Sequence, residues 1–146
     1  MRKLGFCRLG FLGLGSLKLE VLGLSAAALI ALAGPASAAG DAEAGKAAFA
    51  TKCGICHQVG PDAQNLIGPE LNGTVGRKAA SVEGFAYSPG MKKLGEEGYT
   101  WTEEHIDPWI EDPKALLPQS PMSLAFQGIP DADERANIIA YLKTQK

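Results

Sequence analysis

Apolar residues recur at helical spacing most clearly in the last segment of the chain, PDADERANIIAYLKTQK. Ile138, Ile139 and Leu142 fall on one face when this segment is wound as an α-helix. Asp131 stands where a helix N-cap is expected, and Glu134 follows three residues later in the first turn. The pattern predicts a helix that is capped by Asp131 and packs by its apolar stripe.

Two further segments have helical composition. GDAEAGKAAFATKC, residues 40–53, is rich in helix formers and places Phe49 and Cys53 four residues apart, on one face. It predicts a short N-terminal helix that leads directly into the sequence CGICH. The shorter stretch MKKLG, residues 91–95, predicts one or two helical turns.

The segment TWTEEHIDPWIEDP, residues 100–113, predicts a helix that contains a proline. Its apolar positions share one face: Ile106, Trp109 and Ile110. Thr100 stands three residues before Glu103, which is the spacing of a capping box. Pro108 leaves two possibilities. It removes a backbone hydrogen bond to Glu104 inside one helix, or a new helix starts there with Asp107 as its cap.

Between these segments the chain shows neither a helical nor an alternating pattern. Residues 60–90 are dense in Gly, Pro, Asn and Ser and predict one long loop, ordered or disordered. A loop of this length is unusual in a small domain unless it wraps something. Residues 112–128 are broken by prolines. Because no segment predicts a strand of convincing length, we expect an all-α fold with long irregular connections.

The first 38 residues differ from the rest of the chain. Their charged residues are concentrated at the start: Arg2, Lys3, Arg8, Lys18 and Glu20. The following 19 residues, 21–39, are uncharged and end in the small residues ASAA. This order predicts a secretory signal peptide over residues 1–38, cleaved after Ala38 or Ala39, and a periplasmic domain over residues 39–146. An uncleaved membrane anchor is the alternative, since about 20 apolar residues span a bilayer.

Composition narrows the function further. The whole chain has a net charge of −2, and residues 39–146 carry −5, because the signal segment removes four basic side chains and one acidic one. Nucleic acid is therefore not expected as a partner. A domain of this size has a marginal core and often relies on a disulfide, a metal or a cofactor. Its two cysteines are too close in sequence to join distant parts of the fold, so another group must fill the centre.

The sequence CGICH contains Cys53, Cys56 and His57 and is compatible with three kinds of site. A redox-active thiol pair would need a preceding strand and a βαβ setting, and neither is predicted. A structural zinc site would need four ligands, and only His105 could complete the set. Covalent haem attachment requires Cys-x-x-Cys-His, which is present. We interpret the motif as a haem c site, in which the two thiols form thioethers and His57 binds the iron.

Three side chains are candidates for the opposite side of the iron. Met91 lies in a lysine-rich stretch typical of a helix surface or a gap-filling methionine, and His105 lies among acidic residues typical of a solvated helix start. Met122 lies in LPQSPMS, a loop that two prolines stiffen. Because a thioether is a weak ligand, only a segment that already points it at the iron can keep it bound. We therefore expect Met122 to be the second axial ligand.

Taken in order, KCGICH, GPELNG, VGRKA, GFAYS, EDPK and IAYLK resemble the successive landmarks of class I cytochromes c, the mitochondrial type and its bacterial periplasmic relatives. The resemblance runs through essentially all of residues 40–143. It implies a small cytochrome c fold in which the N- and C-terminal helices cross, with Gly45 and Phe49 of the first helix meeting Tyr141 of the second. Long loops then wrap one covalently bound haem.

The resemblance also implies roles for residues outside the motif. Pro69 would accept a hydrogen bond from the second ring nitrogen of His57, which fixes the orientation of the ring. Arg77, Tyr87 and Trp101 would donate hydrogen bonds to the haem propionates and so offset the cost of burying their charge. Without the resemblance, each would be interpreted as an ordinary loop cation or a half-buried aromatic residue.

These features predict a periplasmic electron carrier that is not an enzyme and has no small-molecule substrate. We expect a monomer that forms transient complexes with redox partner proteins such as a membrane oxidase, reductase or dehydrogenase. Four lysines are candidates for steering it to acidic partners: Lys52, Lys92, Lys93 and Lys114. The alternatives are a haem enzyme or sensor with an open iron position, a thiol oxidoreductase, and a membrane-anchored or subunit cytochrome.

Overall fold

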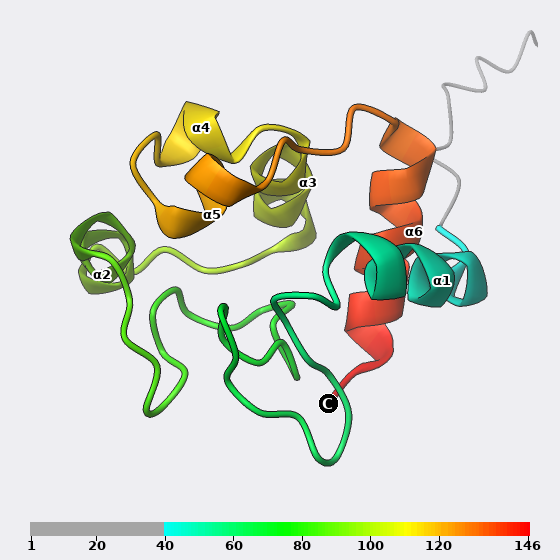
Figure 1. Ribbon diagram of the computed structural model, residues 1–146, viewed down its shortest axis with the longest axis horizontal. Coiled ribbons are helices and arrows are strands. Elements are labelled where there is room, and N and C mark those ends of the chain that lie inside the picture. The colour runs from blue at the N-terminus through cyan, green and yellow to red at the C-terminus, as the bar shows by residue number, and fades with distance from the viewer. Residues whose placement is uncertain (1–39) are drawn as a thin grey trace, which may run out of the picture. The chain divides into compact units, whose positions relative to one another are not determined.

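The computed structural model describes residues 40–146, so the predicted signal peptide and its cleavage site lie outside the described residues. The described chain forms the helices α1 (Ala42–Lys52), α2 (Pro89–Glu96), α3 (Glu103–Glu111), α4 (Pro113–Leu116), α5 (Pro121–Ala125) and α6 (Ala132–Thr144) (Figure 1). Within residues 40–146 there is no β-strand, only a single bridge between Lys78 and Thr100. The predicted all-α class is therefore confirmed. None of these helices has the length and apolar character needed to cross a membrane.

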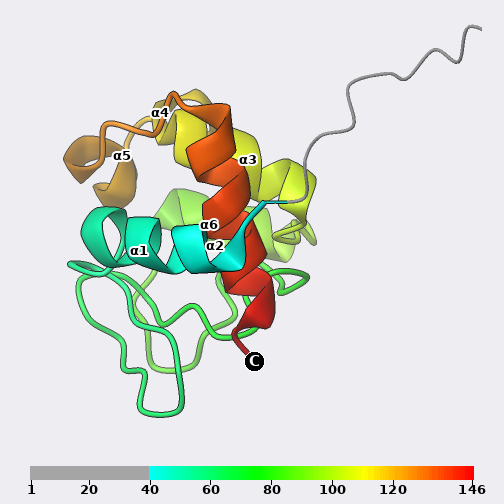
Figure 2. The same ribbon diagram turned by 90° about the vertical axis from the view of Figure 1, so that its right-hand side faces the viewer.

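The first and last helices cross, as the family resemblance implied (Figure 2). A Cβ atom on Gly45 would overlap the carbonyl oxygen of Asn137, so only glycine lets α1 approach α6 this closely. One turn further along α1, the ring of Phe49 packs on that of Tyr141 with 5.5 Å between centroids. Asp41 holds the start of α1 in place, because its backbone N–H donates to Oδ1 of Asn137 at 2.7 Å.

α6 begins where its sequence pattern predicts. Oδ1 of Asp131 accepts a hydrogen bond of 2.9 Å from the backbone N–H of Glu134. A cap of this kind stabilises a helix by about 1 kcal/mol. Ile138, Ile139 and Leu142 are buried and belong to the main hydrophobic cluster. The predicted cap and apolar stripe are both confirmed.

α3 starts two residues later than a cap at Thr100 would place it, so the predicted capping box is wrong. Its N-cap is Thr102. The chain on either side of Thr100 is bonded to another segment: Trp101 N–H donates to the Arg77 carbonyl and Ala79 N–H donates to the Tyr99 carbonyl, each at 2.8 Å. This pairing keeps the backbone around Thr100 extended, and the helix can begin only after it.

Pro108 lies inside α3 and does not start a new helix. The helix is continuous over Glu103–Glu111, and the N–H of Asp112 donates to the Pro108 carbonyl at 3.1 Å. Because Pro108 has no N–H, the Glu104 carbonyl lacks its helical donor. Both residues are exposed, so water can donate to this carbonyl instead. The predicted apolar face is buried: Ile106, Trp109 and Ile110.

A buried arginine joins α6 to α3. Arg135 is only 6% exposed, and its Nε donates to Oδ1 of Asp107 at 2.8 Å. Nη1 donates to the carbonyl oxygens of Ile129 and Pro130, each at 3.0 Å. Because the guanidinium satisfies a carboxylate and two carbonyl groups together, it fixes the end of the α5–α6 connection against α3.

Prolines start three of the short helices. The residues before them, Ser88, Asp112 and Ser120, each accept a hydrogen bond from a backbone N–H in the first turn of α2, α4 and α5. Proline suits the first helical position because the N–H that it lacks would have no partner there. The prolines of residues 112–128 therefore begin α4 and α5, and the predicted turns at residues 91–95 are part of α2.

The long connection between α1 and α2 follows a defined path. The side chain of Asn72 bridges it, accepting from Gly60 N–H at 2.7 Å and donating to the Gly60 carbonyl at 2.8 Å. Gly73 N–H donates to the carbonyl of Gln145 at 2.9 Å, which ties the connection to the end of α6. Of the two predicted alternatives, the ordered loop is correct.

Candidate functional site

The CGICH motif continues the winding of α1. Cys53 is the C-cap of α1, and its N–H donates to the Phe49 carbonyl at 2.8 Å. His57 N–H donates in turn to the Cys53 carbonyl at 2.9 Å, so the chain makes one further turn through the motif. Cys53 and Cys56 are half-buried and form no disulfide. The two thiols therefore stand one turn apart, followed at once by the imidazole.

The free thiol of Cys53 is not an activated one. Burial, with smaller contributions from Cys56 and Glu134, raises the pKa of Cys53 to about 11. A redox-active pair needs the opposite shift, because the thiolate is the nucleophile. The raised pKa therefore argues against a thiol oxidoreductase.

The imidazole of His57 is held by one backbone group. Its Nδ1 lies 2.7 Å from the carbonyl oxygen of Pro69, the contact that the resemblance implied. A carbonyl only accepts, so this contact places the ring proton on Nδ1 and leaves the lone pair of Nε2 available to a metal. Burial lowers the pKa of His57, against the opposing effect of the Pro69 hydrogen bond. The ring is therefore neutral at pH 7, the form that binds iron.

Gly68 lies against the face of this ring, and replacing it by alanine is expected to displace His57. A Cβ atom at Gly68 would overlap Cε1 of the ring and lie 2.6 Å from Nδ1, so the ring must turn away from Pro69. Loss of such a supporting contact typically weakens metal binding 10- to 100-fold. The thioethers to Cys53 and Cys56 would still retain the haem, so we expect about tenfold weaker binding of the ring to the iron. Absorption spectra of the holoprotein should show this as a partial loss of the low-spin haem c bands.

Gly73→Ala is the matched control, because a Cβ there has nothing within 4 Å and adds only the strain of a φ of +61°. It should keep the wild-type absorption spectrum. A Gly68→Ala protein with the wild-type absorption spectrum would show that the ring position does not depend on this glycine.

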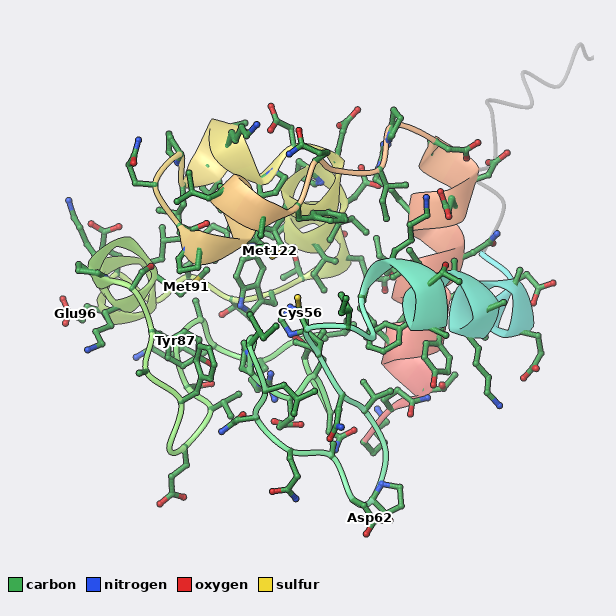
Figure 3. All side chains as sticks on the ribbon, viewed as in Figure 1. Cys56, Asp62, Tyr87, Met91, Glu96 and Met122 are labelled. Atoms are coloured by element: carbon green, nitrogen blue, oxygen red, sulfur yellow. The ribbon has the colours of Figure 1, made fainter. Side chains whose placement is uncertain are left out.

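Met122 lies in the single-turn helix α5, whereas the sequence predicted an open loop. Oγ of Ser120 accepts from Ser123 N–H at 3.1 Å, and Oγ of Ser123 donates to the Leu117 carbonyl at 2.6 Å. Ser123 is completely buried. Figure 3 shows Met122 pointing from α5 toward the side on which Cys56 lies. The two serines thus fix the backbone that carries the thioether.

Neither serine was predicted as a site residue. The spacing Ser-Pro-x-Ser contained the signal, since it places a serine at the N-cap, a proline at N1 and a second serine at N3. What the sequence did not indicate is the hydrogen bond from Ser123 to the Leu117 carbonyl, six residues earlier, which accompanies the complete burial of the serine.

The other candidate ligands have different surroundings. Met91 is half-buried and packs against the main hydrophobic cluster, in agreement with a gap-filling role. His105 is exposed, with Nδ1 at 2.6 Å from the Thr100 carbonyl and its ring stacked on Tyr99 at 4.4 Å. In the described part of the chain, no three His, Cys, Asp or Glu side chains come together as a metal-binding group.

The predicted propionate donors lie in neighbouring segments. Trp101 and Arg77 are joined through their backbones by the 2.8 Å hydrogen bond described above. Burial raises the pKa of the Tyr87 phenol, and the nearby charge of Arg77 partly opposes this. Nη1 of Arg77 donates to Oε1 of Glu70 at 2.6 Å. The sequence did not predict this carboxylate beside the donors.

The surroundings of these residues suit a porphyrin. Cys53 and Met122 pack against the main hydrophobic cluster together with half-buried apolar side chains: Leu71, Val75, Leu117 and Phe126. The donor set comprises two thiols one turn apart, an imidazole with a free Nε2, and a thioether on a fixed backbone. This set and its apolar surroundings fit a covalently attached haem.

A small helical domain with crossed end helices and a Cys-x-x-Cys-His turn defines a covalent haem protein. The family model described as Cytochrome c matches residues 42–146, and the chain belongs to this family. Its cofactor is therefore one covalently bound haem c, and Cys53 and Cys56 lie in the motif that receives it. The chain is a haem-containing electron carrier and not an enzyme.

Known relatives agree with this assignment. The chain is 48% identical over 103 residues to cytochrome c-550 of Nitrobacter winogradskyi, covering 70% of this chain and 89% of the relative. It is 47% identical over 111 residues to the cytochrome c-type cyt cy of Rhodobacter capsulatus, covering 75% of this chain but only 52% of that protein. The solved structure of cytochrome cH from Methylobacterium extorquens matches with a TM-score of 0.63 and 42% identity, covering 72% of this chain and 99% of that one. The predicted cytochrome c fold is confirmed.

Proposed function

We propose that this chain is a periplasmic electron carrier in which haem c is attached to Cys53 and Cys56 and its iron is held by His57 and Met122. The observation that carries the proposal is the contact of 2.7 Å between His57 Nδ1 and the Pro69 carbonyl, which leaves Nε2 free directly after a one-turn pair of thiols. When bound, haem supplies a one-electron ferric/ferrous couple.

The protein's own residues keep the ligand geometry constant. Pro69 and Gly68 fix the imidazole ring, while Ser120 and Ser123 fix the turn that carries Met122. Because both ligands are held by the fold before they bind, little structural change opposes electron transfer. The apolar side chains around Cys53 and Met122 keep water away from the site. In the same proposal, Arg77, Tyr87 and Trp101 donate hydrogen bonds to the propionates.

Location and partners form the second part of the proposal. The signal-like first 38 residues support export to the periplasm, with a retained anchor as the alternative. We infer a monomer that exchanges electrons in transient complexes with redox proteins. The candidate steering lysines are exposed, but Lys52 lies 3.7 Å from Glu134 and Lys93 lies 3.8 Å from Glu97, so their charges are partly balanced.

Absorption spectra of the purified holoprotein test the ligand set. We expect sharp low-spin haem c bands after reduction and the weak far-red band of methionine ligation after oxidation. Carbon monoxide should not bind rapidly to the reduced protein at neutral pH, because Met122 fills the sixth position. Rapid binding would instead favour a gas-binding or peroxidase-like protein with an open iron, and an absence of haem would reject both. The mass of the native protein shows whether residues 1–38 are retained.

A further inference from the structure

We propose that Glu70 lowers the reduction potential of the bound haem by placing a carboxylate among its propionate-binding residues. The inference rests on the proposed function. Both oxygens of this carboxylate are engaged: Oε1 accepts from Nη1 of Arg77 at 2.6 Å, and Oε2 accepts from the N–H of Asn72 at 2.7 Å. The side chains of Glu70 and Arg77 are only 21% and 20% exposed. The charge of Glu70 is thus fixed in position and only partly accessible to water.

Glu70 and its loop occupy much of the hydrogen-bonding capacity of Arg77. Besides Glu70 Oε1, Nη1 donates to the Asn72 carbonyl at 2.8 Å, and Nη2 donates to the Glu70 carbonyl at 2.7 Å. A guanidinium has five N–H groups, so these contacts leave the Nε–H and one Nη2–H for a propionate. Arg77 is therefore shared between a protein carboxylate and the carboxylates of the cofactor.

The other two proposed donors are each linked to this pair, Tyr87 through charge and Trp101 through a backbone hydrogen bond. Burial raises the pKa of Tyr87; the charge of Glu70 adds to this increase, and the charge of Arg77 opposes it. Trp101 is bonded to Arg77 through the backbone. Glu70 thus belongs to the cluster that is proposed to bind the propionates. There it adds a negative charge and partly neutralises the positive charge of Arg77.

The sign of the effect follows from the charges. Oxidised haem carries one more positive charge than reduced haem, so a nearby carboxylate stabilises the oxidised state and lowers the potential. A charge held in a partly buried cluster is screened less by salt than a surface charge. Removing the charge of Glu70 should therefore raise the potential.

The test is a redox titration of holoprotein carrying Glu70→Gln, which keeps an acceptor oxygen for Arg77 or Asn72. We expect the equilibrium constant for reduction by a reference couple to rise about threefold to tenfold, roughly 28 to 59 mV for one electron. Glu83→Gln is the matched control, because Glu83 is an exposed carboxylate in the same loop. It should change the constant by less than a third of the Glu70→Gln effect.

A shift for Glu70→Gln no larger than that of Glu83→Gln, or a shift to lower potential, would overturn the proposal. The far-red band of the oxidised variant must match the wild type, so that any change in potential is not a change of iron ligand. If Glu70→Gln does not yield holoprotein, Glu70→Asn is titrated with the same criteria. A failure of the proposed function can be told apart from a failure of this proposal. In that case the wild-type protein itself would lack the low-spin haem c bands or the far-red band.

Discussion

Oxidised Met122→Ala protein is expected to lose the weak far-red absorption band completely. Alanine has no donor atom, so the sixth position of the iron would be taken by water or left open, and carbon monoxide should bind to the reduced form. Methionine ligation raises the potential of a haem, and axial ligands set haem potentials over about 0.8 V. We therefore expect the reduction potential to fall by on the order of 100 mV or more. Spectra and a redox titration of the same preparation measure both effects.

Met91→Ala is the control for this variant, since Met91 is the other half-buried methionine that packs on the core. Truncating it should cost about 1 to 2 kcal/mol of stability, less than a fully buried methionine would. The far-red band should remain. An unchanged band in Met122→Ala, or a band lost only in Met91→Ala, would show that Met122 does not bind the iron.

Gly45→Val is expected to destabilise the folded holoprotein by at least about 3 kcal/mol. The new side chain would overlap the Asn137 carbonyl and crowd the Cβ of Tyr141, so α1 and α6 would have to move apart. This separation would also disturb the packing of Phe49 on Tyr141. For a domain of this size we expect the Tm to fall by roughly 10 to 20 °C, measured by circular dichroism on the oxidised holoprotein.

Ala44→Val is the control for Gly45→Val. It measures how much stability is lost through the lower helix propensity of valine alone, without the clash between the helices. Ala44 lies on the same helix but is exposed, so valine there should cost less than about 1 kcal/mol. If Gly45→Val were as stable as Ala44→Val, the close approach of the two helices would not require glycine.

The elements that the sequence predicted correctly are those with local signals. The cap at Asp131 and the stripe of Ile138, Ile139 and Leu142 depend only on residues within one helix. The crossing at Gly45 was predicted in another way, from the family resemblance. No periodicity indicates which glycine meets a distant carbonyl.

The wrong or incomplete predictions share a different cause. Thr100 has the spacing of a cap, but the pairing of its neighbours with Arg77 and Ala79 decides where α3 starts. Met122 was placed in a loop because the proline before it was interpreted as a breaker, whereas the cap at Ser120 makes it a helix start. In both cases a tertiary contact or a cap selected one of several local conformations.

The candidate site also has one part with a local sequence signal and one part that depends on tertiary contacts. The CGICH motif is continuous in sequence, so its chemistry could be predicted from five residues. The contact between Arg77 and Glu70 could not, because GPELNG and VGRKA only become a cluster when the loop between α1 and α2 folds back on itself. Charges that tune a site are therefore harder to predict from sequence than the ligands that form it.

The crossing of α1 and α6 also bears on how the chain reaches its folded state. Asp41 and Asn137 share a hydrogen bond although 96 positions separate them. Bringing the two ends together closes a loop that contains most of the domain, and this closure costs chain entropy that the contacts between the helices must offset. A contact of this kind raises the contact order above that of a helical bundle held together by local contacts. Joining the two ends directly and opening the polypeptide elsewhere would turn this long-range contact into a local one.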